Sequence, residues 1–173
     1  MHFPKMAVTA ESIACESVDF AVEVVRQFGD ERPAALDVVV ANASETPTTI
    51  TAGGVPPLST PCTRHTDGDA LVCLVPDGRS ADQTGAEYRD LIPETPDEDG
   101  YWRISGSFTV PDVGVVFTLD PGETFRGSYA VLAGPAAERL LARGTYRFAD
   151  NLGIGPSPEE ATFVSLAFDL AIE

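Results

Sequence analysis

Three side chains that can bind a metal or act as a nucleophile lie close together in the sequence: Cys62, His65 and Cys73. A Cys-x-x-His pair followed by a nearby Cys supplies three of the ligands that zinc takes in proteins. No fourth ligand is evident nearby, and His2 or Cys15 would complete the set only if the amino-terminal segment packs against this region. A thiol enzyme would instead need Cys62 as the nucleophile and His65 as its base.

The same cysteines also fit two purely structural interpretations. A disulfide between Cys62 and Cys73 would close a short loop and stabilise the fold by about 3 kcal/mol. Alternatively, both side chains are reduced thiols that pack as small apolar groups. The spacing leaves the disulfide, the free thiols and the metal site open, so a metal- or thiol-dependent enzyme at Cys62, His65 and Cys73 is one alternative function.

The remaining candidate ligands are acidic. Asp67-Gly68-Asp69 and Asp97-Glu98-Asp99 carry the oxygen ligands that calcium prefers, but neither follows the spacing of a calcium-binding loop, and solvated surface loops explain them better. The sequence contains no phosphate loop, nucleotide fingerprint or serine elbow. The sequon Asn42-Ala43-Ser44 would carry sugar only on an exported chain, and its residue types are also typical of a turn. We therefore expect a non-enzymatic protein without a cofactor.

The charge of the chain restricts its partners. The net charge is −16, from 27 acidic and 11 basic side chains, and Lys5 is the single lysine. Such a chain repels the phosphates that nucleic-acid-binding proteins neutralise with Lys and Arg, so we expect no nucleic-acid partner. The composition resembles proteins of salt-loving archaea, in which an acidic surface stays hydrated in concentrated salt.

Hydropathy gives an expectation about membranes and location. No apolar stretch approaches the roughly 20 residues that cross a bilayer, so we expect no membrane insertion. No continuous apolar run precedes Cys15, as an export or lipid-anchor signal would require. As the chain stands we expect a cytoplasmic protein, whereas a chain that has lost a leader would be at the cell surface or extracellular.

Alternating apolar residues predict β-strands along most of the chain. Turn residues at 29–33 separate the first two strands, which we expect to form an antiparallel pair, and those at 120–123 form a corner or hairpin. One short helix is expected at Pro135–Ala142. The expected strands cover residues 19–28, 35–41, 48–51, 70–75, 101–110, 113–119, 124–132, 144–148 and 161–172.

This arrangement of about seven to nine short strands predicts an all-β fold, an immunoglobulin-like antiparallel β-sandwich with one short helix. We expect an amino-terminal arm at residues 1–18 and a single sandwich domain at 19–173. The acidic segment 76–100 is an unusually long connection for a compact domain, and such loops are often functional or flexible.

Three sequence segments carry a resemblance to small immunoglobulin-like modules. They are the strand-turn-strand pattern at 37–50, Leu119-Asp120-Pro121-Gly122-Glu123-Thr124-Phe125, and Arg143-Gly144-Thr145-Tyr146-Arg147-Phe148. In this order they are similar to the intracellular proteinase inhibitor family of bacilli, over about residues 35–148. That resemblance implies a sandwich fold and an inhibitory role, although the Trp-rich stretch of that family is reduced here to Tyr101-Trp102. The chain also resembles small acidic proteins of halophilic archaea, which implies no activity.

The leading functional hypothesis is a non-enzymatic interaction module of a halophilic organism that binds another protein through its loops, chiefly 55–69 and 76–100. Tyr101 and Trp102 are candidate anchors, since aromatic side chains dominate interface energetics, although the single Trp of a sandwich often packs in the core. The alternative is a protease inhibitor. In that case Pro56, Pro57 and Leu58, within the Pro-rich segment 55–61, would lie extended in a protease cleft.

Overall fold

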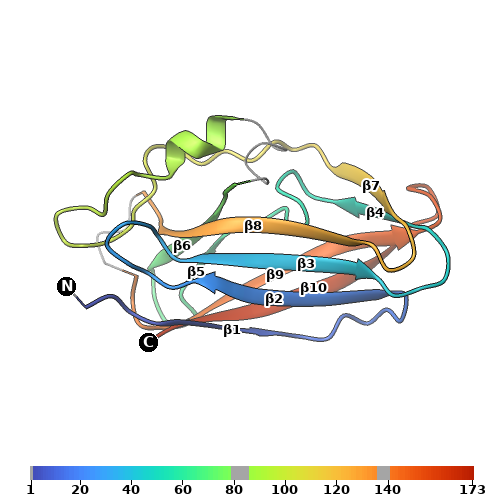
Figure 1. Ribbon diagram of the computed structural model, residues 1–173, viewed down its shortest axis with the longest axis horizontal. Coiled ribbons are helices and arrows are strands. Elements are labelled where there is room, and N and C mark those ends of the chain that lie inside the picture. Colours follow the sequence, from blue (N-terminus) through green and yellow to red (C-terminus); the bar gives the residue numbers. More distant parts are fainter. Residues whose placement is uncertain (1, 79–85, 136–140) are drawn as a thin grey trace.

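The computed structural model describes residues 2–78, 86–135 and 141–173, which form two antiparallel five-stranded sheets packed as a β-sandwich (Figure 1). The first sheet has the order β1-β10-β9-β4-β7 and the second the order β2-β3-β8-β6-β5. The first consists of β1 (Met6–Ala10), β10 (Thr162–Ile172), β9 (Gly144–Gly155), β4 (Thr48–Ala52) and β7 (Val115–Leu119). The second consists of β2 (Val18–Arg26), β3 (Ala35–Asn42), β8 (Thr124–Ala133), β6 (Leu71–Pro76) and β5 (Cys62–Arg64). The all-β sandwich prediction is therefore confirmed.

The inner faces of the two sheets meet in one apolar core. Phe148 and Phe168 are partners across β9 and β10, and their rings stack with centroids 5.0 Å apart. Phe20 of β2 reaches Phe168 from the opposite sheet at 6.4 Å. Such aromatic pairs bury large apolar areas and fix the distance between the layers. The largest fully buried side chains among the described residues are Trp102, Tyr129, Tyr146, Phe148, Phe168, Leu36, Ile50, Leu58, Leu74, Leu132, Leu152 and Leu166.

Most of the expected strands are present, and the expected pair β2–β3 forms. The described residues contain ten strands rather than seven to nine. β1 arises within the expected arm and pairs with β10 from Met6↔Ile172 to Ala10↔Phe168. β5 was not predicted because it has three residues, too few to show an alternation. β9 continues through the turn-like residues 150–155, because β10 pairs with it as far as Ile154 and β4 pairs with Gly153 to Gly155.

The prediction of a strand at 101–110 is wrong. Gly100 and Gly106 adopt positive φ values of 82° and 105°, which break an extended conformation on either side of Trp102. Between them the chain makes a single isolated bridge, Arg103↔Ala133. The helix expected at Pro135–Ala142 falls mainly on residues 136–140, which lie outside the described residues. The described helical segment is instead a 3₁₀ turn, η1 (Ala86–Leu91).

The turn at Asp120–Glu123 joins strands of different sheets, since β7 pairs with β4 and β8 pairs with β3 and β6. It is therefore a corner between the layers and not a hairpin. Gly122 takes a positive φ of 76°, as the turn requires. Within the described residues, no helix is long and apolar enough to span a membrane.

Candidate partner-binding site

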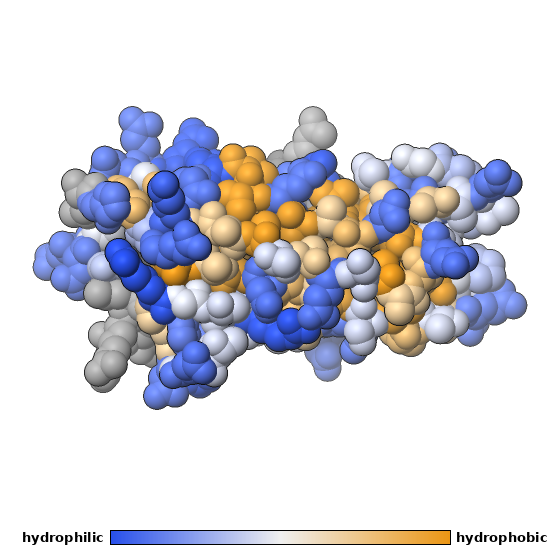
Figure 2. Space-filling view, turned by 90° about the horizontal axis from the view of Figure 1, so that it is seen from below, coloured by the Kyte–Doolittle hydropathy of each residue, from blue (hydrophilic) through white to orange (hydrophobic). Residues whose placement is uncertain are grey.

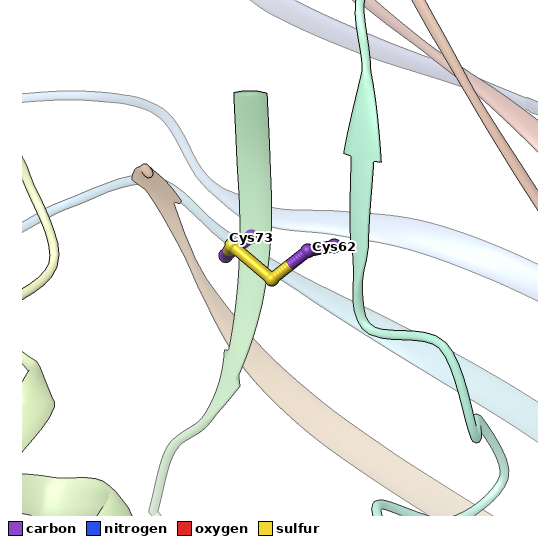
Figure 3. Close-up of a disulfide and its surroundings, with 2 residues drawn as sticks. All are labelled: Cys62 and Cys73. Carbon is purple, nitrogen blue, oxygen red and sulfur yellow. A yellow bond between two sulfur atoms is a disulfide. The ribbon is translucent and has the colours of Figure 1, made fainter. Parts of the chain in front are cut away.

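Cys62 and Cys73 form a disulfide in the structure, directly across the β5–β6 pair (Figure 3). Their Cα atoms are 4.1 Å apart. Both sulfur atoms are consumed by this bond, so neither cysteine carries a thiolate for a metal or a substrate. Among residues 2–78, 86–135 and 141–173, no group of three or more His, Cys, Asp or Glu side chains is arranged to hold a metal ion.

His65 has a structural environment on the same side of the sandwich. Its Nδ1 accepts a hydrogen bond from the Asp67 N–H at 2.9 Å, and its Nε2 lies 3.0 Å from the Arg143 carbonyl oxygen. One tautomer satisfies both contacts, with the proton on Nε2. The ring also packs edge-on against Tyr146 at 5.2 Å, and the Tyr146 hydroxyl donates to the Ala142 carbonyl four residues upstream. His65 therefore fixes the start of β9, and its Nε2 points at a backbone carbonyl.

The acidic triplet at 97–99 is likewise a folded turn. The Asp97 carboxylate accepts hydrogen bonds from the N–H groups of Asp99 and Tyr101, at 3.1 and 2.8 Å. It also accepts a hydrogen bond from Arg103 Nε at 3.2 Å. These interactions explain an Asp at this position without a metal ion.

The segment 55–61, which we expected to be exposed and extended, is neither over its first half. Val55, Pro56, Pro57 and Leu58 are all buried, and Leu58 is 1% exposed. The Pro56-Pro57 bond is cis, and Val55 and Leu58 exchange backbone hydrogen bonds of 3.1 and 2.9 Å across it, which makes a tight turn. The expectation that Pro56, Pro57 and Leu58 form an exposed binding strand is therefore wrong.

The turn at Pro56-Pro57 is buried because of residues in β8, more than seventy positions away in the sequence. The buried Tyr129 hydroxyl lies 2.7 Å from the carbonyl oxygens of both Val55 and Pro56. Gly127 lies directly under the turn, since a Cβ atom there would be 2.7 Å from the Pro56 oxygen. Because Gly127 has no side chain, the Pro56-Pro57 turn can pack directly against the backbone of β8.

Asp150 holds the second half of this segment, and no local sequence signal pointed to it. Its carboxylate accepts hydrogen bonds from the backbone N–H groups of Ser59 and Thr60, at 2.6 and 2.9 Å, and from the Ser59 hydroxyl. Carboxylate hydrogen bonds of this kind are stronger than neutral ones. The segment 55–61 is thus fixed at both ends by residues of other strands.

The buried hydroxyl of Tyr129 should make the free energy of unfolding fall as the pH rises above about 10. Burial raises the pKa of its hydroxyl well above the ordinary value, because the phenolate would be separated from water. In the unfolded chain the group titrates near pH 10, so its contribution to stability is fully present below about pH 10 and is lost as the pH rises toward the folded-state pKa.

We expect Tyr129→Phe to reduce the slope of the unfolding free energy above pH 10 by up to about 1.4 kcal/mol per pH unit. Burial also raises the pKa of Tyr146, which accounts for part of the remaining slope. The variant should also lose about 1–3 kcal/mol at neutral pH, because the buried Pro56 carbonyl loses its hydroxyl donor, whereas the Val55 carbonyl keeps the Leu58 N–H. Urea titrations at several pH values measure both effects, and an unchanged alkaline slope would contradict the assignment.

Trp102 and Tyr101 differ in exposure. Trp102 is 1% exposed, and its Nε1–H donates to the Gly29 carbonyl at 2.9 Å. It packs in the core, so the expectation that it is a surface anchor is wrong. Tyr101 is half-buried and lines a small pocket with His2 and Pro4.

Asn42, in the sequon, is buried and fully engaged. Its Nδ2 donates to the carbonyl oxygens of Thr46 and Leu119, at 2.8 and 2.9 Å. Its Oδ1 accepts from the N–H and the hydroxyl of Ser44, at 2.9 and 2.7 Å. A glycan on Nδ2 would remove one of these donations and would have to pass through the fold, so Asn42 acts here as a turn residue and a brace to β7.

Asn42→Ala is expected to lower the free energy of unfolding by about 1–3 kcal/mol, since it removes the Asn42 donor to the Leu119 carbonyl in a buried contact, while the exposed Thr46 carbonyl keeps the Ser44 hydroxyl. Asn42→Asp should cost at least as much, because a carboxylate turned toward two carbonyl oxygens cannot donate. Asn151→Ala, at an exposed position on β9, is the control and should change stability by less than about 0.5 kcal/mol. Denaturant unfolding measures all three, and a neutral Asn42→Asp would contradict the hydrogen-bond assignment.

The residues that sequence reasoning missed surround β7. The large exposed apolar side chains of the described residues include Val113 (70% exposed), Val115 and Val116 (51%). Beside them lies an open apolar groove of about 410 Å³, which we call the β7 groove. It is lined by Gly54, Pro56, Pro111, Val113, Val115, Phe117 and Phe125. The rings of Phe117 and Phe125 stack with centroids 4.4 Å apart and form its floor between the two sheets.

Backbone packing places the groove at this edge. A Cβ atom on Gly54 would be 2.6 Å from the Pro111 carbonyl oxygen, so residues 110–113 lie directly on Gly54. A Cβ atom on Gly114 would likewise be 3.1 Å from the Ala52 carbonyl oxygen. The lack of a side chain at Gly54 thus lets the segment before β7 cross over the chain.

A second apolar surface lies over β1 and β2, where Figure 2 shows a band of hydrophobic side chains between hydrophilic ones. β1 and β2 carry half-buried apolar side chains that pack against the core, among them Val8, Ala10, Phe20, Val22 and Val24. None of these side chains is as exposed as Val113 or Val116. The β7 groove is therefore the stronger candidate for a binding surface.

No protein-family model, curated protein or solved structure matches the chain at a significant level of similarity. The fold is thus established by its own strand pairing, and function has to be argued from the surface.

Proposed function

We propose that this chain is a non-enzymatic protein-binding module whose partner docks on the β7 groove. The observation that supports the proposal is that two exposed valines, Val113 and Val115, line an open apolar groove at one edge of the sandwich. Contiguous exposed apolar surface of this kind is typical of interaction sites, because leaving it in water is unfavourable.

This proposal assigns partner binding to a different part of the chain from the loops 55–69 and 76–100 that the sequence suggested. Of the segment 55–69, Pro56 contributes to the groove wall, whereas Leu58 is in the core. The burial of Val55 to Leu58 removes the basis on which 55–61 was expected to act as an inhibitory strand, so we do not propose protease inhibition. The disulfide likewise leaves an enzyme at Cys62, His65 and Cys73 without a free thiol.

Site-specific cross-linking tests the proposal. A photoreactive amino acid is placed at position 113, in the groove, or at position 25, where Val25 is similarly exposed (58%) on β2. Both proteins are irradiated in an extract of the native source, prepared in low and in molar salt because the net charge of −16 makes any interaction depend on salt. We expect one protein to be cross-linked from position 113 and not from position 25.

The purified partner should then bind the unmodified chain, and Val113→Asp should weaken that binding at least about tenfold, since it places a charge in an apolar contact. Val25→Asp is the matched control and should leave binding unchanged. Identical cross-linking from both positions, or none from position 113, would reject the groove as the binding site.

A further inference from the structure

In the part of the chain that the structure describes, the outer edge of β7 carries less protection than the other three sheet edges. Natural sheet edges are usually guarded by charges, prolines, bulges or a covering segment. β2 carries Asp19 and Glu23 and a register shift between Val24 and Arg26. β5 has only three residues and is tied to β9 by the Thr63 hydroxyl, which donates to the Arg147 carbonyl at 2.8 Å.

β1 is protected by a side chain. The Gln27 amide accepts a hydrogen bond from the Met6 N–H at 2.7 Å and donates to the Met6 carbonyl at 2.8 Å, so it acts as a substitute strand there. Among the described residues, β7 has one such contact, at its last residue, where Asn42 Nδ2 donates to the Leu119 carbonyl at 2.9 Å. From Val115 to Leu119 it contains no charged residue, no proline and no register shift against β4. In the described part of the chain, the turn and loop backbone hydrogen bonds include none to these five residues.

The β7 groove lies along this same edge. Val115 and Phe117 line the groove, while Val116 between them is exposed on the outer face. A strand added beside β7 would lie about 4.8 Å away and would alternate its side chains in the same way. Every second side chain of such a strand would therefore face the groove, and its backbone would meet the free N–H and C=O groups of β7.

The charged residues near the β7 groove indicate which side chains an added strand would need at its two ends. Residues 104–125 contain Asp112, Asp120 and Glu123 and no Lys or Arg. Asp112 lies just before β7 and Asp120 just after it, and both are exposed. Among the described residues neither carboxylate has a basic partner within salt-bridge distance. The two ends of the edge are thus both negative.

A second copy of this chain fits these charges poorly. If two β7 strands paired antiparallel, Asp120 of each would approach Asp112 of the other, and like charges facing one another are destabilising. A strand with basic residues at both ends makes the opposite, favourable pairing.

We propose that an extended segment of a partner protein, apolar at alternate positions and basic at both ends, adds to the first sheet as a sixth strand beside β7. This inference rests on the proposed function and specifies the chemistry of its partner. Backbone hydrogen bonds would supply a general affinity for strands, the groove would select apolar side chains, and Asp112 and Asp120 would select basic flanks.

A synthetic peptide tests the inference. The probe is a fluorescent peptide of about nine residues that alternates valine and threonine between two arginines at each end. One control peptide carries glutamates in place of the arginines, and a second has methyl groups on alternate backbone nitrogens, which removes donors needed for strand pairing. Fluorescence anisotropy should show binding of the basic peptide, and both controls should bind at least about tenfold more weakly.

The matching protein variants change the charge equally at two places. Asp112→Asn combined with Asp120→Asn should weaken binding of the basic peptide about fivefold at low ionic strength and hardly at all in molar salt, where the screening length is about 3 Å. Asp19→Asn combined with Asp30→Asn removes the same charge from the opposite side and should have little effect. Hydrogen exchange should also slow at alternate amides of β7 and remain unchanged in β1 and β2.

Three results would overturn strand addition at β7: equal binding of the glutamate peptide, equal binding of the methylated peptide, or unchanged exchange in β7 when the basic peptide is bound. Self-association of the chain that protects β7 would also overturn it in favour of a second copy. If any of these occurs while a partner is still cross-linked from position 113, only this inference fails. If position 113 captures no partner, the proposed function itself fails.

Discussion

Replacing Trp102 with alanine is expected to lower the free energy of unfolding by about 4 kcal/mol, the largest effect that we predict for a single substitution. The side chain is 1% exposed, so its removal leaves a cavity that the surrounding strands can fill only in part. The Gly29 carbonyl would also lose the indole N–H that donates to it at 2.9 Å. Urea unfolding followed by circular dichroism measures the change.

Two controls separate these contributions. Trp102→Phe keeps most of the apolar volume and removes the N–H donor, and we expect it to cost less than half as much as alanine. Tyr101→Ala, at a half-buried neighbour, should cost about 1 kcal/mol. A cost below about 1 kcal/mol for Trp102→Ala would contradict the core position and restore the surface anchor that the sequence alone allowed.

Removal of the Cys62–Cys73 disulfide is expected to lower the free energy of unfolding by about 3 kcal/mol. The bond closes a loop with a sequence separation of 11 residues, and it restricts the unfolded chain more than the folded one, in which β5 and β6 already pair. The double replacement Cys62→Ala and Cys73→Ala should show this loss without a reductant. Reductant should lower the stability of the wild-type protein by a similar amount and leave the double variant unchanged.

The thiol count provides an independent check. The chain has three cysteines, of which Cys15 is free in the structure, so one thiol should react in denaturant before reduction and three after it. Cys15→Ala should abolish the first reaction with little effect on stability. Three reactive thiols before reduction would contradict the disulfide and reopen the free-thiol and metal alternatives.

The sequence determined most strands because a half-buried strand has a local signature. Val22, Val24 and their neighbours in β2 alternate with exposed residues, and the large apolar side chains from Val164 to Ile172 in β10 alternate with small or polar ones. The Asp120–Glu123 turn could also be predicted from the sequence, since Pro and Gly set its dihedral angles. What these patterns could not assign was the partner of each strand, so the turn was left as a corner or a hairpin until β7 and β8 were found in different sheets.

The candidate site was less predictable, because burial depends on distant residues. Pro56-Pro57-Leu58 has the composition of an exposed extended segment, yet Tyr129 and Gly127 hold it as a buried turn. β7 was predicted as a strand, but nothing in its own sequence indicated that its outer edge would be free or that Phe125 would complete a groove beside it.

The sequence by itself thus determined an acidic all-β chain, its main strands and its turns, because these follow from side-chain type and spacing within a few residues. Only the tertiary structure decided that Cys62 lies against Cys73, that Trp102 and Leu58 enter the core, and that the exposed apolar surface is at β7. Those outcomes depend on which strands pair and which glycines let segments approach, and these are contacts between residues far apart in the chain.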